Sequence, residues 1–140
     1  MTNRLLRTLC RMYEVIYSDK PFKNTKTVAF LIYHNKVVGF GVNSDKTSPM
    51  QNLYRLRTDL AEIENFIDKE HAEVNCLRKI GKTFDIDFDK AEIVIISKRC
   101  DKSFRLARPC SVCMEAIKDF GIHRVWYTNR EQWFSYEYVE

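Results

Sequence analysis

The chain is organised around two short stretches, His71-Ala72-Glu73 and Pro109-Cys110-Ser111-Val112-Cys113. Each stretch stands where the following apolar pattern predicts the start of a helix. Together they offer one imidazole and two thiolates, a ligand set that suits a tetrahedral zinc ion with its fourth position left to water. The carboxylate of Glu73, two residues after the imidazole, is better suited to moving protons than to completing the ligand shell.

The residues after each stretch repeat with the period of an amphipathic helix. The inward-facing residues are Val74, Leu77 and Ile80 in the first helix and Met114, Ile117 and Phe120 in the second. Gly81 and Gly121 provide the stops. The positive potential at a helix N-terminus keeps nearby thiols deprotonated, which explains why both stretches belong at helix starts.

Further helices and strands are expected before, between and after these two stretches of the sequence. We expect an amphipathic helix over Asn3 to Ser18 and β-strands over residues 28–33, 37–42, 91–97 and 123–128. Residues 44–49 read as a loop, followed by a helix that contains Leu56, Leu60, Ile63 and Phe66.

The sheet should be mixed. The run Ile93-Val94-Ile95-Ile96 is apolar on both faces and predicts a central strand. A last strand over Trp133 to Val139 should return antiparallel through a turn near Asn129-Arg130-Glu131, because too little chain remains for a parallel crossover. The expected fold class is therefore α/β, a three-layer α/β/α arrangement in one domain spanning residues 1–140.

Composition narrows the class of function. The hydrophobic content of 45% and charged content of 30% are ordinary for a globular protein. A net charge of +4 suits a small anionic substrate but falls short of the basic surface of a dedicated nucleic-acid binder. Five cysteines and no apparent secretory segment favour a reducing compartment, so we expect a cytoplasmic protein, in the cytoplasm of whichever cell makes it, with no membrane contact.

The pattern H-x-E followed by P-C-x-x-C resembles the signature of the cytidine deaminase superfamily. The resemblance extends from about residue 27 to residue 128, and the helix opening over residues 71–75 is similar to that of deoxycytidylate deaminases and small phage-encoded relatives. It implies a cytidine-deaminase-like fold and a Zn²⁺ ion held by His71, Cys110 and Cys113. It also implies that Glu73 is the catalytic proton shuttle and that the protein is a homo-oligomer.

Four residues are candidate substrate contacts, namely Asn43, Ala72, Arg105 and Arg108. Family members commonly place an asparagine at the position of Asn43 to bind the sugar or base of the substrate, although asparagine is also frequent in turns. The loop over residues 98–108 contains five basic residues and one acidic residue, and it leads into the second zinc-binding stretch. This loop is either a phosphate site or a solvated loop.

The resemblance implies hydrolytic deamination of a cytosine nucleotide, with deoxycytidylate (dCMP) to dUMP as the leading reaction. Three alternatives remain open. The predicted antiparallel last strand is closer to the deaminases of free cytidine and deoxycytidine. The basic loop would also suit a polynucleotide deaminase acting on cytosine or adenosine. The chain could instead be a non-catalytic, zinc-stabilised module that binds nucleotides or nucleic acid.

Overall fold

A computed structural model describes residues 1–17, 26–58, 69–81 and 85–140. Its elements are α1 (Asn3–Tyr17), β1 (Lys26–Tyr33), β2 (Lys36–Val42), α2 (Pro49–Leu56), α3 (Ala72–Ile80), the short 3₁₀ helix η2 (Phe88–Lys90), β3 (Glu92–Lys98), α4 (Ser111–Phe120), β4 (Arg124–Thr128) and β5 (Phe134–Tyr138). The two stretches that carry the candidate zinc ligands therefore open α3 and α4, as the sequence predicted.

The strands form one mixed sheet in the order β2-β1-β3-β4-β5. β3 and β4 pair parallel, and the other three neighbouring pairs are antiparallel. The predicted central strand is confirmed, because β3 lies in the middle of the sheet and its residues 93–96 are buried. The antiparallel return of β5 is also confirmed, through a turn in which the Asn129 side-chain oxygen accepts from the amides of Glu131 and Trp133.

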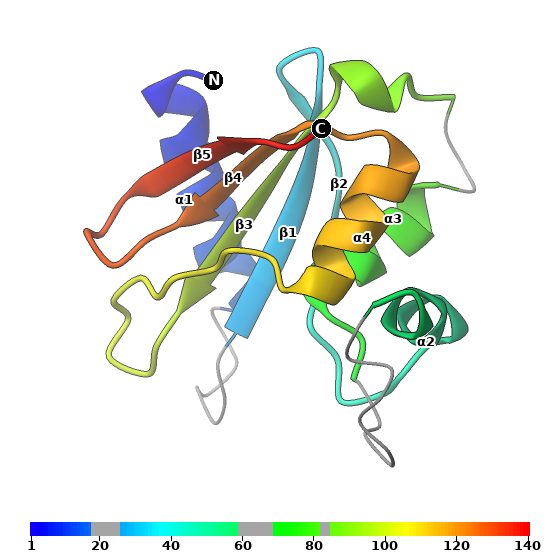
Figure 1. The fold of residues 1–140 in the computed structure, drawn as a ribbon. Helices are drawn as coiled ribbons and strands as arrows, with labels where there is room; N and C mark the ends of the chain where they lie inside the picture. Colours follow the sequence, from blue (N-terminus) through cyan, green and yellow to red (C-terminus); the bar gives the residue numbers. More distant parts are fainter. Residues whose placement is uncertain (18–25, 59–68, 82–84) are drawn as a thin grey trace.

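Helices cover both faces of the sheet, with α1 on one face and α2, α3 and α4 on the other (Figure 1). The alternation of side chains along β1 explains the two layers, since Phe30 faces α1 while Leu31 faces the other three helices. The apolar stripe of α1 consists of Leu6, Leu9, Tyr13 and Tyr17. The three-layer α/β/α expectation is thus confirmed.

A helix that the apolar pattern did not predict, α2, begins at Pro49 and ends at Leu56, so the expectation of a loop through residue 49 is wrong at its last residue. α2 starts at Pro49, where Ser48 is the N-cap and its hydroxyl accepts from the amide of Gln51. Serine followed by proline is a frequent helix start, and this signal defines the observed boundary. The expected helix residues 60, 63 and 66 lie outside the described part of the chain. None of the helices in the described ranges has the length and apolar character that crossing a bilayer requires.

β2 and α3 lie in direct backbone contact at Gly41. A Cβ atom at this position would lie 2.2 Å from the amide nitrogen of Cys76 and 2.6 Å from the carbonyl oxygen of Ala72. The missing side chain therefore lets the end of β2, which leads into Asn43, approach the first turn of the helix that carries Glu73.

We expect Gly41→Ala to lower the free energy of unfolding by about 2–3 kcal/mol, because the new methyl group meets backbone atoms that cannot rotate away. Chemical denaturation of the wild type and the variant measures the loss. Gly39→Ala is the matched control, since its methyl group would meet only the end of the flexible Ile80 side chain. Equal losses in the two variants would contradict the backbone-contact explanation.

Candidate metal centre and active site

The N-termini of α3 and α4 bring three metal-ligating side chains together. His71 is the N-cap residue of α3 and Cys110 is that of α4, with Cys113 in the first turn of α4. The His71 Nδ1 atom lies 3.2 Å from the Sγ of Cys113 and 3.5 Å from the Sγ of Cys110. Within the described ranges this is the one group of three or more such side chains, and its donor atoms all lie within 4.8 Å of one another.

These donors fit a zinc ion in both chemistry and spacing. Tetrahedral zinc, with typical Zn–N and Zn–S bond lengths, separates a nitrogen and a sulfur ligand by about 3.6 Å. The two nitrogen–sulfur distances at this site are close to that value. The other three cysteines take no part in this group, and Cys76, a residue of α3, is buried in the core.

The surroundings shift the pKa values of two groups at this site in opposite directions, lowering that of Cys110 and raising that of Glu73. A hydrogen bond from Cys113 lowers the pKa of the Cys110 thiol to about 4, against the opposing effect of burial, and His71 adds to the lowering. Burial raises the pKa of the Glu73 carboxyl, whose residue is 5% exposed. A bound cation would act in the opposite direction on Glu73.

A cavity of about 300 Å³ opens beside this group. His71, Glu73 and Cys110 line it, and so do all four candidate substrate contacts, namely Asn43, Ala72, Arg105 and Arg108. Thr27 and Ser97 also line the cavity and their hydroxyl oxygens lie 3.0 Å apart. The sequence did not single them out, because each is an ordinary polar residue at the edge of an apolar strand.

Asn43 has a structural connection to the first strand. Its side-chain oxygen accepts from the Thr27 amide at 3.0 Å and from the Tyr17 hydroxyl at 3.4 Å. Its backbone amide donates to the Thr27 carbonyl at 3.3 Å. These contacts fix the asparagine at the cavity wall, so a structural role and a substrate contact are compatible at this position.

The cations of the loop over residues 98–108 do not gather at one point. Lys98 pairs with Glu14 and lies over the ring of Tyr13, on the α1 side of the sheet. Arg108 makes two hydrogen bonds, of 2.8 and 3.0 Å, to the carboxylate of Glu137. The loop is therefore neither a continuous phosphate-binding surface nor simply solvated.

Arg105 differs from these two cations because no described residue forms an ion pair with it. Its backbone amide donates to the Ser97 carbonyl at 3.0 Å, and its carbonyl accepts from the Thr128 hydroxyl at 2.9 Å. The backbone is thus held on both sides while the exposed side chain lines the cavity.

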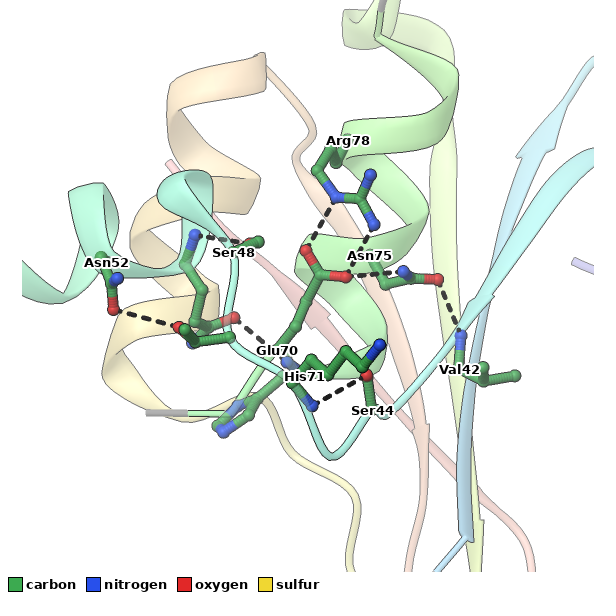
Figure 2. A network of polar contacts seen from close by, with 11 residues as sticks. Val42, Ser44, Ser48, Asn52, Glu70, His71, Asn75 and Arg78 are labelled. Atoms are coloured by element: carbon green, nitrogen blue, oxygen red, sulfur yellow. Dashed lines mark hydrogen bonds and ion pairs between the residues drawn. The ribbon is translucent and has the colours of Figure 1, made fainter. Parts of the chain in front are cut away.

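Two further residues hold the start of α3, and the sequence did not single them out. Gln51 is fully buried, and its side-chain oxygen accepts from the His71 amide at 3.1 Å. Glu70 lies at the centre of the polar network in Figure 2. Burial alone would raise the pKa of Glu70, but hydrogen bonds from Arg78, Ser48 and Asn75 outweigh it and lower the pKa to about 2.

Comparison with known proteins agrees with this geometry. A family model described as "Cytidine and deoxycytidylate deaminase zinc-binding region" matches residues 3–129. The chain belongs to this deaminase family. The match includes both stretches that carry His71, Cys110 and Cys113, and family membership supports a hydrolytic deaminase. A search of curated proteins gave no match.

Solved structures of deaminases share the fold. The dCMP deaminase of the cyanophage S-TIM5 in complex with dCMP and dUMP has 22% identity and a TM-score of 0.59, covering 92% of this chain and 84% of that chain. The apo form of that protein has 19% identity and a TM-score of 0.55, covering 92% of this chain and 86% of that chain. Cytidine deaminase from Burkholderia pseudomallei has 16% identity and a TM-score of 0.58, covering 99% of this chain and 93% of that chain.

Removal of one donor from the His71, Cys110 and Cys113 set should abolish stable zinc binding. Loss of an outer-shell partner alone typically costs about 10–100-fold in metal affinity, so we expect Cys113→Ala to weaken zinc binding by more than about 100-fold. Competition with a chromophoric chelator measures the affinity. Cys100→Ser, at an exposed cysteine outside the group, is the control and should bind zinc as the wild type does.

Proposed function

We propose that the protein hydrolytically deaminates a cytosine nucleotide, with dCMP to dUMP as the reaction. The observation that carries this proposal is a single cavity lined by His71 and Cys110 of the candidate zinc-ligand set, by Glu73 and by Arg105. Its volume of about 300 Å³ lies at the small end of the range for ligand pockets and suits one nucleotide.

Within this proposal each residue has a distinct task. Zinc held by His71, Cys110 and Cys113 would supply Lewis-acid activation of a water molecule near neutral pH. Glu73 would take one proton from the water whose oxygen bonds to C4 and would deliver it to N3 of the cytosine ring. It would then take the remaining proton of that oxygen and pass it to the 4-amino group, so that the C4–N bond breaks, ammonia leaves and the base becomes uracil.

Recognition of the nucleotide falls to the cavity wall. We assign the phosphate to Arg105, because a guanidinium makes strong charge-assisted hydrogen bonds to phosphate oxygens and its backbone is held in place. Arg108 would contribute less, since Glu137 already occupies its guanidinium. Asn43 and the backbone of Ala72 would contact the sugar or the base.

Deamination of free cytidine or deoxycytidine is the second candidate. The antiparallel β5 favours it, because the family resemblance associates that ending with the nucleoside enzymes. The substrate panel described below also tests polynucleotide deamination and a non-catalytic binding role. The single domain over residues 1–140, the homo-oligomeric state and the cytoplasmic location remain predictions.

Glu73→Ala tests the catalytic assignment. We expect it to retain zinc and fold but to lower kcat by about 1,000-fold or more, because no other carboxylate among the described residues lines the cavity to move the protons. Ammonia release is measured with dCMP, CMP, deoxycytidine, cytidine and a single-stranded oligonucleotide. A zinc-loaded wild type that is silent on all of these would contradict the proposal, whereas turnover of nucleosides alone would favour the second candidate.

Arg105→Ala tests phosphate recognition. We expect the KM for dCMP to rise about 10- to 100-fold through loss of a charged hydrogen bond, while the KM for deoxycytidine stays unchanged. Arg99→Ala removes an exposed cation of the same loop that does not line the cavity, and it serves as the matched control. An equal rise for the nucleotide and the nucleoside would exclude Arg105 as the phosphate contact.

A further inference from the structure

Glu70, the residue before the ligand His71, has a buried carboxylate with a side chain that is only 4% exposed. Arg78 donates to both of its oxygens, from Nε at 2.8 Å and from Nη2 at 2.9 Å. The side-chain amide of Asn75 donates to it at 2.6 Å, and Ser48 adds a further hydrogen bond. Each of these contacts to the carboxylate comes from a donor.

The hydrogen bonds continue from Glu70 to the end of β2 (Figure 2). Asn75 uses its Nδ2 to donate to Glu70 and its Oδ1 to accept from the Val42 amide at 3.1 Å. The direction of this relay is fixed, because Val42 can only donate and the Glu70 carboxylate can only accept. A flipped Asn75 amide would place donor against donor at Val42 and acceptor against acceptor at Glu70.

The backbone of Glu70 ties down the segment that follows β2. Its amide donates to the Lys46 carbonyl at 2.9 Å, and its carbonyl accepts from the Ser44 amide at 3.0 Å. The short segment over residues 42–46, which includes Asn43, is thereby held to the residue next to His71 at several points. One carboxyl-bearing residue thus connects the proposed substrate-binding segment to the zinc-binding helix.

We propose that Glu70 is a positioning residue that, through Asn75, sets the substrate-contacting segment at residues 42–46 against the start of α3. The inference rests on the proposed function, since it assigns Asn43 to the substrate and His71 and Glu73 to the reaction. Displacement of a reacting group by about 1 Å can cost about 100-fold in rate, so a fixed relay at this point affects catalysis directly.

A stabilising role alone does not account for this arrangement. A buried ion pair is often no more stable than well-packed apolar residues of similar volume, whereas the directional relay defines one relative placement of strand and helix. The relay also satisfies the Val42 amide at the outer side of β2, which is an edge strand of the sheet.

Three variants test the proposal through the direction of the relay. Glu70→Gln places an amide group among donors, and Asn75→Asp places two carboxylates in contact. The double variant Glu70→Gln with Asn75→Asp rebuilds a donor–acceptor pair, because the amide introduced at position 70 can donate to the carboxylate introduced at position 75. That carboxylate still accepts from Val42, and one negative charge remains beside Arg78.

We expect each single variant to lower kcat/KM by about 10- to 100-fold with zinc content unchanged, and the double variant to exceed the single variants by about tenfold. Amide hydrogen exchange at Val42 should accelerate in the single variants and return towards the wild-type rate in the double variant. Tyr54→Phe is the matched control: it removes the 2.6 Å hydrogen bond to Asp119 between α2 and α4 and should leave kcat/KM unchanged.

Two results would overturn the proposal. One is a lowered melting temperature in the single variants with kcat/KM and Val42 exchange unchanged. The other is a double variant no better than the single variants in both activity and exchange. Because exchange needs no substrate, the relay can be tested even if the wild type shows no deaminase activity, and failure of the proposed function remains distinguishable.

Discussion

The meeting of two helix N-termini, those of α3 and α4, is the constraint on which the rest of the site depends. N-cap positions are usually occupied by Ser, Thr, Asp or Asn, whose side chains accept from the first free amides of the helix. Here His71 and Cys110 occupy them, and neither side chain makes a capping hydrogen bond. Both side chains instead point towards each other. They therefore belong to the group of candidate metal ligands and do not cap their own helices.

The loss of capping at α3 is balanced by contacts from other elements. Gln51 of α2 accepts the amide of His71, and Glu70 collects donors from α3 and from the N-cap of α2. The start of α3 is therefore held from neighbouring elements, which gives the donor cluster a rigid surrounding structure.

The remaining cavity wall comes from chain segments that the sheet brings to the same end. β1 contributes Thr27, β3 contributes Ser97, and the segment after β2 contributes Asn43. The close approach of β2 to α3 at Gly41 sets the distance between that wall and the helix that carries Glu73. Arg105 joins them because its loop is fixed by Ser97 and by Thr128 at the end of β4.

The amino-acid sequence was sufficient to predict the two helix starts, the grouping of His71, Cys110 and Cys113, the central strand and the antiparallel last strand, because each prediction follows from residue types at short spacing. The packing of segments distant in the chain decides which cavity-lining cation of the loop is paired with a carboxylate. Arg105 and Arg108 both line the cavity, and Glu137 pairs with Arg108. The role of Glu70 could not be predicted for the same reason. Its hydrogen-bond donors precede and follow it in the sequence, and they meet at its carboxylate only when β2, α2 and α3 pack together.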